Sequence, residues 1–296
     1  MSRRGALLFV AMCVIWGIPY LLIRVAVREL APETLVFARC LPAAVLLLPV
    51  ALHRGHWRPV VARWRWLLVY SVVELCVPWY LLSSAEQHLT SSVAALLIAT
   101  VPLIGVVLAR VTGGERVGGR RLVGLLLGLS GVSVLVGVDV HGNWRAVAAT
   151  LVVAVGYATG PFIISRRLAD LPSLGVVAGS LAVTSVVYAP AALTHRPSHL
   201  SGEVIASVIV LALVCTALAF LLFFALIAEI GPARATVITY VNPAVAVLLG
   251  VWLLHESVTA GLLIGFPLII MGSVLATGRS VSAGAPDGPG VPVAEP

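Results

Sequence analysis

Ten apolar runs, each long enough to cross a lipid bilayer, divide almost the whole chain. A helix of about 20 residues spans the ~30 Å hydrocarbon core of a membrane. Charged residues are only 10% of the chain, against about 25% in a soluble domain. The sequence therefore predicts an all-α integral membrane protein with ten transmembrane helices. Hydropathy places them at residues 6–24, 33–52, 66–84, 91–110, 121–139, 145–165, 173–193, 203–227, 233–254 and 259–278.

The basic residues fall unevenly between these runs. All 19 are arginine, and the formal net charge is +7. With an inside N-terminus, fourteen arginines fall on the cytoplasmic side and four outside, with Arg39 within a run. Because cytoplasmic loops carry an excess of basic residues, we expect a multi-pass protein of the cell (plasma or inner) membrane with both termini in the cytoplasm. The positive charge is interpreted as a property of these loops, not as a sign of nucleic-acid binding.

The second half of the chain repeats landmarks of the first at an offset of 141 residues. Each repeat holds five spans, an odd number, so the second copy is inverted relative to the first. Inverted repeats are typical of secondary transporters, whose halves alternately open a central site to either side. We expect repeats at 1–139 and 140–278, followed by a disordered cytoplasmic tail at 279–296. The offset pairs Pro102 with Pro243, Glu115 with Glu256, Gly124 with Gly265 and Gly131 with Gly272.

Glu74 and Arg39 are the ionisable residues deep inside the apolar runs. A charge at the bilayer centre costs at least about 2.5 kcal/mol, so such residues usually face a bundle interior or a wet cavity. Glu74 lies about 12 Å from the cytoplasmic end of its span and Arg39 about 9 Å from the outer end. This separation disfavours an ion pair, unless the span edges are wrong by several residues. Because the repeat puts Cys215 at the place of Glu74, we hypothesise that Glu74 accepts a proton or binds a cationic group.

Prolines inside several spans indicate freed backbone carbonyls, because proline has no N–H and kinks a helix. Polar or aromatic neighbours of some of these prolines favour a lined cavity. For Glu115 and Glu256, before the fifth span of each repeat, we prefer capping of the helix that follows, with gating as the alternative. The substrate or coupling candidates are Glu74, Tyr80, Pro19, Tyr20, Thr100, Pro102, Tyr157, Tyr240, Asn242 and Pro243, and the structural or gating candidates are Arg39, Pro78, Glu115 and Glu256. Histidines and cysteines show no ligand spacing, so we expect no metal and no cofactor.

Several segments resemble the EamA-type transporters of the drug/metabolite transporter superfamily. They are "WGIPYLLIR", "PETLVFAR", "SAEQHLTSSVAALLIATVPLIGVVLARVTGGERV" and "ALIAEIGPARATVITYVNPAVAVLLGVWLLHESV". The resemblance implies two inverted five-helix repeats around a cavity lined mainly by the first, third and fourth spans of each half. It also implies movement, often export, of amino acids or other small metabolites. Trp16, Gly17, Arg39, Pro102, Glu115, Pro243 and Glu256 match the family pattern, whereas the sixth span lacks the Trp-Gly pair of the first.

We therefore expect a secondary-active permease that works by alternating access, with a small-molecule substrate and with protons as a candidate coupling ion. A membrane-embedded enzyme, the first alternative, requires a cluster of His, Asp or Glu near one interface. A nontransporting sensor or scaffold requires a sizeable extramembrane module. The sequence contains neither feature, so we expect no enzymatic activity. The substrate, the direction of transport, the coupling and the oligomeric state are left open by the sequence.

Overall fold

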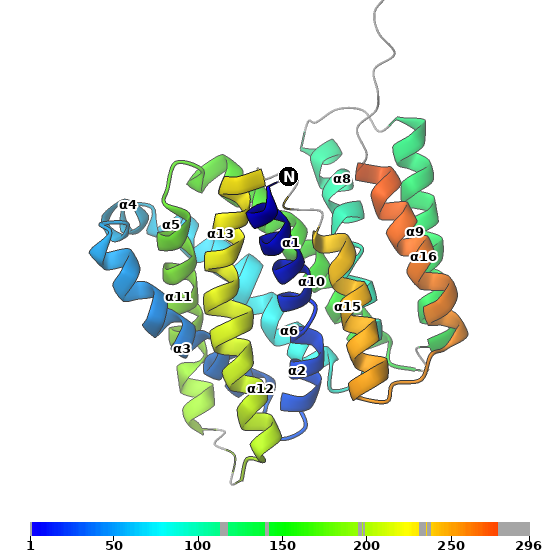
Figure 1. Cartoon of the computed structure of the whole chain (residues 1–296), viewed down its shortest axis with the longest axis horizontal. Helices are drawn as coiled ribbons and strands as arrows, with labels where there is room; N and C mark the ends of the chain where they lie inside the picture. The colour runs from blue at the N-terminus through cyan, green and yellow to red at the C-terminus, as the bar shows by residue number, and fades with distance from the viewer. Residues whose placement is uncertain are drawn as a thin grey trace, which may run out of the picture.

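The computed structural model describes residues 2–112, 118–139, 142–194, 197, 199–230, 235 and 238–277, and the regular elements within these ranges are all helical (Figure 1). Nine of the helical segments described are long and apolar enough to cross a membrane, and Ile238–Leu253 is a shorter apolar helix. The prediction of an all-α membrane protein is confirmed. The ninth predicted span, 233–254, extends beyond the residues described, so the exact count of ten stays a prediction.

The spans are built from the following helices. They are α1 (Arg3–Ile15), α2 (Pro19–Ala26), α3 (Pro32–His53), α4 (Trp57–Ala62), α5 (Trp64–Tyr70), η1 (Ser71–Cys76), α6 (Val77–Ala85), α7 (Ser91–Ile98), α8 (Val101–Val111), α9 (Gly119–Asp139), α10 (Trp144–Ile163), η2 (Ile164–Leu168), α11 (Ser173–Thr194), α12 (Gly202–Ala212), η3 (Leu213–Leu218), α13 (Ala219–Ile230), α15 (Ile238–Leu253) and α16 (Ala260–Thr277). The short helix α4, which precedes the third span, was not expected from hydropathy.

Two of the predicted proline kinks are wrong, because the helix ends before the proline and a new one begins there. The first span breaks after Ile15, and α2 begins at Pro19. The fourth span breaks at Ala99 and Thr100, and Pro102 lies in the first turn of α8. A proline at a helix start loses no hydrogen bond, because the first N–H groups of a helix have no partner within it.

Within the residues described, three spans contain a π-helical segment, in which the turn is widened by one residue. In the third span, η1 contains Glu74 and ends just before Pro78. In the eighth span, η3 occupies the equivalent stretch without a proline. The third segment, η2, ends the sixth span. The segments η1 and η3 lie at nearly the same place under the 141-residue offset, but a proline follows only η1. The widened turn therefore does not require a proline.

Small residues let α9 and α16 lie side by side (Figure 1). A Cβ atom on Gly124 would lie 2.5 Å from the backbone nitrogen of Ala276, and one on Gly272 would lie 2.4 Å from that of Gly128. Backbones that approach this closely exclude any side chain at the glycine positions. Gly124 and Gly272 therefore serve the close packing of the fifth span on the tenth. The other helix pairs in close contact include α3 with α11, α7 with α15, α1 with α13 and α6 with α10.

Candidate functional site

Arg39 lies in the interior of the bundle and is 9% exposed. Its guanidinium carbon lies 3.7 Å from the ring centroid of Trp79 in α6. Its Nε donates a hydrogen bond of 2.9 Å to the hydroxyl of Thr216 in η3. A desolvated cation is stabilised by an aromatic face and by hydrogen bonds. Arg39 therefore connects α3 to a helix of each half of the chain.

The widened turn of η3 gives Thr216 its second partner. The Thr216 hydroxyl donates to the carbonyl of Leu211, five residues earlier, at 2.8 Å. This hydroxyl is therefore oriented with its proton towards the backbone and its lone pairs towards Arg39. The π-helical segment thus helps to position the acceptor that holds the arginine.

Glu74 points from η1 against α10. A Cβ atom on Gly160 would lie 1.8 Å from Oε2 of Glu74, and one on Gly156 would lie 2.5 Å from the carbonyl oxygen of Val73. Two glycines one turn apart thus form the surface on which η1 rests. Oε2 is buried and has no hydrogen-bond partner among the residues described. An unsatisfied acid at this depth is a costly feature that a purely structural helix contact does not require.

Glu74 and Arg39 do not form an ion pair, in agreement with the separation argued from their span positions. The ion pair found in the described part of the chain joins Arg63 to Asp170. Tyr157 of α10 interacts electrostatically with both Arg39 and Glu74. Its side chain also lies within hydrogen-bonding reach of Trp79. The predicted candidates Arg39, Glu74 and Tyr157 are thus brought together.

Glu86 is a residue of this region that the sequence reasoning missed. It follows the last residue of α6 and is fully buried, and neither carboxyl oxygen has a hydrogen-bond partner among the residues described. Burial raises the pKa of this carboxyl well above its ordinary range, and the nearby Arg24 and Arg39 oppose that rise. The Glu86 carbonyl accepts a hydrogen bond from Arg24. In the sequence Glu86 looks like a loop residue, and only the packing of the spans buries it.

Tyr20 completes the group. It lies in α2, is 9% exposed, and interacts electrostatically with Tyr157, Glu86 and Arg39. The six residues that the Arg39–Trp79 contact and these electrostatic interactions link are called the buried polar cluster. They are Tyr20, Arg39, Glu74, Trp79, Glu86 and Tyr157.

Glu256 caps a helix, but not the one expected. Its carboxylate accepts hydrogen bonds from the backbone N–H groups of Ser91 at 2.7 Å and Ser92 at 3.0 Å, and from both serine hydroxyls. It therefore caps α7 of the first half instead of the following helix α16. At α16 the hydroxyl of Thr259 accepts from the N–H of Leu262 at 3.1 Å. Glu115, the counterpart of Glu256, lies outside the residues described.

Asn242 supports the break in the first span. With its amide nitrogen turned towards two carbonyls, it donates to Cys13 at 3.1 Å and to Ile238 at 2.9 Å. The N–H of Gly17, the usual helical partner of the Cys13 carbonyl, bonds to Val14 instead. The side chain of Asn242 therefore satisfies an acceptor that the break releases. Asn242 therefore has a structural role, and the substrate role predicted for it stays a prediction.

Other candidates also have local partners. The Thr100 hydroxyl donates to the carbonyl of Leu97 at 2.6 Å. Tyr240 pairs with the hydroxyl of Thr277 in α16. Tyr80 stacks on Tyr188 with ring centroids 6.1 Å apart. None of these contacts joins Thr100, Tyr240 or Tyr80 to the buried polar cluster.

The candidate prolines lie at three kinds of position. Pro19 and Pro102 begin new helices, as described above. Pro78, in the first turn of α6, is buried and packs on α10, since a Cβ atom on Gly156 would lie 2.8 Å from its Cγ. Pro243 is buried inside α15. Pro78 and Pro243 thus keep the predicted place within a continuous helical span.

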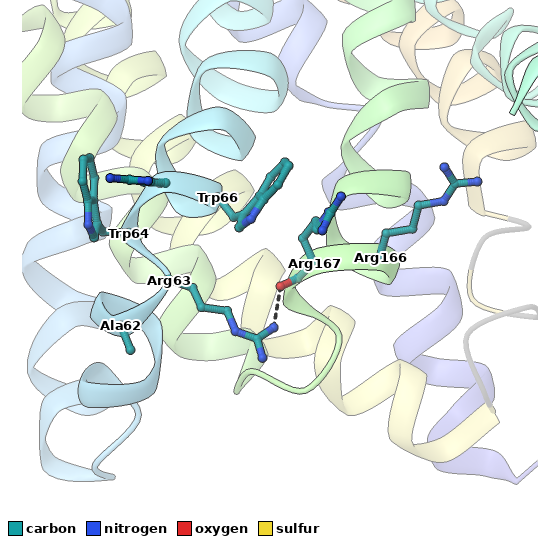
Figure 2. A pocket seen from close by; sticks show the side chains of 7 residues that line it. Ala62, Arg63, Trp64, Trp66, Arg166 and Arg167 are labelled. Carbon is teal, nitrogen blue, oxygen red and sulfur yellow. Dashed lines mark hydrogen bonds between the residues drawn. The ribbon is translucent and has the colours of Figure 1, made fainter.

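Two of the cavities in the described part of the molecule are similar in volume. One, of about 540 Å³, is lined by residues 62–66 and by Arg166 and Arg167 (Figure 2). The other, of about 530 Å³, is an apolar groove of α15 and α16. None of the predicted substrate or coupling residues lines either cavity. The central cavity implied by the family resemblance stays a prediction.

The apolar helices and the polar cluster buried among them are features of a polytopic membrane transporter. The EamA-like transporter family matches residues 3–137 and, in a second copy, residues 144–278. The chain belongs to this family.

Curated relatives carry transporter names. The chain is 34% identical over 280 residues to the "Uncharacterized inner membrane transporter YedA" of Escherichia coli K12, covering 90% of this chain and 88% of the relative. It is 26% identical over 274 residues to the "Probable terminal-alkyne amino-acid exporter" of Streptantibioticus cattleyicolor, covering 90% and 91%. A crystal structure with 23% identity superposes with a TM-score of 0.65 and covers 94% of this chain and 97% of its own. This last likeness concerns the fold alone.

Proposed function

We propose that the protein is a secondary-active permease that exports an amino acid or a related small metabolite by alternating access. The observation that carries the proposal is the buried polar cluster, which places a cation, Arg39, and an acid, Glu74, inside apolar spans and a second buried acid, Glu86, at the end of one. Because placing ionisable groups inside a membrane costs free energy, such groups usually belong to a substrate or ion pathway. The relative named as an amino-acid exporter supports the substrate class and the direction.

We propose further that residues 1–139 and 140–278 form inverted repeats, with both termini and the tail 279–296 in the cytoplasm. The close helix pairs α3 with α11, α7 with α15 and α9 with α16 join the second, fourth and fifth spans of each half to their counterparts, which supports such symmetry. The corresponding positions of η1 and η3 support it as well. The fourteen arginines on the proposed cytoplasmic side, against four outside, support the orientation.

The opposite charges of the cluster suit a zwitterion. The Nε of Arg39 already donates its hydrogen bond to Thr216. The two Nη groups form the edge that binds a carboxylate in bidentate fashion. Glu74 supplies the complementary acid, for the ammonium group of the substrate or for a coupling proton. Tyr157 interacts electrostatically with both charges and adds a hydroxyl group to the site. Trp79 shields the arginine, which limits hydration of the site.

Growth of overexpressing cells across a panel of toxic amino acids, amines and drugs tests the substrate and the direction. Resistance supports export, and sensitisation indicates uptake instead. Counterflow in proteoliposomes then measures the selected compound directly. Arg39→Gln is expected to abolish counterflow of a zwitterionic substrate. Arg28→Gln, a change at an exposed arginine between α2 and α3, serves as control. Counterflow that survives Arg39→Gln at the wild-type rate contradicts the assigned site.

A further inference from the structure

The cavity drawn in Figure 2 lies between the start of α5 and the end of η2 and is strongly basic. Its volume is about 540 Å³. We call it the arginine pocket. It is lined by Ala62, Arg63, Trp64, Arg65, Trp66, Arg166 and Arg167.

Arg63 holds the two walls of the arginine pocket together. Its Nη groups bind the carboxylate of Asp170 in bidentate fashion, at 2.8 and 2.7 Å. It also donates to the backbone carbonyl of Arg167 at 2.7 Å, the dashed line in Figure 2. The charge of Arg63 is therefore compensated by Asp170. Arg63 therefore anchors the backbone at Arg167 and is not the group offered to a ligand.

The other three arginines each lie near an aromatic ring. Arg167 lies 4.4 Å from the ring centroid of Trp66, and Arg65 lies 5.6 Å from that of Trp64. Arg166 lies 5.9 Å from Phe162 and donates to the Thr112 carbonyl at 3.5 Å. None of the three has an ion-pair partner in the part of the chain that is described. A guanidinium stacked on a ring keeps its N–H edge free for an anion.

The position of the arginine pocket along the spans points to the membrane surface. The third span begins at Trp64, and the sixth ends at Leu168. Trp64 is 52% exposed and Trp66 36% exposed, as is typical of tryptophans at the level of the lipid headgroups. The pocket is therefore open at the depth where phospholipids carry their phosphates.

The repeat shows that the arginine pocket is not part of the shared scaffold. An offset of 141 residues places Val204, Ile205, Ala206 and Ser207 opposite residues 63–66. The same offset places Val25 and Ala26 opposite Arg166 and Arg167. The helices form at those positions without any arginine, so the charges require a separate explanation.

We propose that the arginine pocket binds a phosphate group, supplied by the headgroup of an anionic phospholipid. Arginine is suited to this ligand because its planar edge matches two phosphate oxygens. Basic pockets between transmembrane helices bind acidic headgroups in this way. A phosphate held by Arg65 from α5 and by Arg167 from η2 joins the third span to the sixth. These spans carry Glu74 and Gly160, so the bound lipid stabilises the contact between them. The proposal does not depend on the transported substrate.

The test uses the purified full-length chain in a neutral detergent. Dioctanoyl phosphatidylglycerol, dioctanoyl phosphatidylcholine and sodium phosphate are titrated at matched ionic strength, and binding is followed by thermal shift and by native mass spectrometry. The variants are Arg65→Gln and the double variant Arg166→Gln/Arg167→Gln. Arg145→Gln is the matched control, because Arg145 lies 5.6 Å from Trp144, as Arg65 does from Trp64, but outside the pocket.

The wild type is expected to bind phosphatidylglycerol more tightly than phosphatidylcholine, and each arginine removed is expected to weaken that binding about 5-fold. Arg145→Gln is expected to bind as the wild type does. If inorganic phosphate competes at equal concentration and shows the same dependence on the variants, the phosphate site stands and its ligand comes from solution. Equal binding of the two lipids, or unchanged binding by Arg65→Gln, overturns the proposal. If the double variant fails to fold, phosphatidylglycerol binding by Arg65→Gln alone tests the proposal.

Discussion

The carboxyl group of Glu74 occupies the space that any side chain at Gly160 would fill, since a Cβ atom there would lie 1.8 Å from Oε2. The third and sixth spans therefore touch at the π-helical segment that carries Glu74. Gly156, one turn earlier, meets the backbone of the same π-helical segment. The absence of a side chain on α10 is thus part of what lets this acid lie inside the bundle.

Gly160→Ala is expected to displace the Glu74 carboxyl and to lower the stability of the protein. Overpacking of an interior typically costs about 1–3 kcal/mol. Thermal unfolding in detergent measures the effect. Gly105→Ala is the control, because a Cβ atom there meets nothing within 4 Å, and it is expected to unfold as the wild type does. Equal unfolding temperatures for both variants contradict the contact.

Arg39→Gln is expected to destabilise the protein because it leaves Trp79 and Thr216 without their shared partner. Loss of a hydrogen bond to a charged group costs about 1.5–3 kcal/mol. Arg39→Lys keeps the charge but not the planar stacking, so an intermediate loss is expected. A double-mutant cycle with Thr216→Val isolates the hydrogen bond. Strictly additive effects of the two changes show that Arg39 and Thr216 are not coupled.

Glu256→Ala is expected to lower the unfolding temperature, because four donors at the start of α7 lose their acceptor. Loss of a helix cap typically costs about 1 kcal/mol. Glu203→Ala, a change at an exposed acid in the first turn of α12, is the control. A gating role predicts the reverse pattern, with a change in transport rate at unchanged stability.

Glu29 links the segment after α2 to the start of α12. The backbone N–H of Ser201 donates to its carboxylate at 2.7 Å, and this bond holds the pKa of Glu29 below its ordinary range. A carboxylate with a lowered pKa stabilises the folded state above its unfolded pKa, and the contribution is lost as pH falls through the folded value. Unfolding temperatures from pH 7 to pH 3 are therefore expected to fall less steeply for Glu29→Gln than for the wild type. Parallel curves contradict this contribution.

The spans could be predicted because a helix that crosses a membrane needs about 20 predominantly apolar residues. Arg39 and Glu74 stood out for the same reason, since a buried charge in a lipid environment is rare enough to be informative alone. The break at Pro19 was visible as a proline, but not as a new helix start. That outcome depends on Asn242, which satisfies the Cys13 carbonyl from more than 200 residues away.

Residues whose role depends on a distant partner escaped prediction. Glu86 has the sequence context of a loop, and its burial arises only when α2, α6 and the start of α7 assemble. Glu256 was expected to cap the helix that follows it, because local sequence shows only that helix. Its actual partners, Ser91 and Ser92, lie 165 and 164 residues away. Nothing in the spacing of these residues indicates the pairing.

We propose that the acid at Glu74 serves transport and not packing. Proteoliposomes containing the wild type or Glu74→Gln, loaded with the substrate selected in the growth panel, test it under an imposed pH gradient. Glutamine keeps the shape of the side chain but cannot take up a proton. Uptake against a concentration gradient is expected to vanish in Glu74→Gln, while Glu203→Gln retains it. Gradient-driven transport by Glu74→Gln at the wild-type rate would show that the Glu74 carboxyl is not needed for coupling.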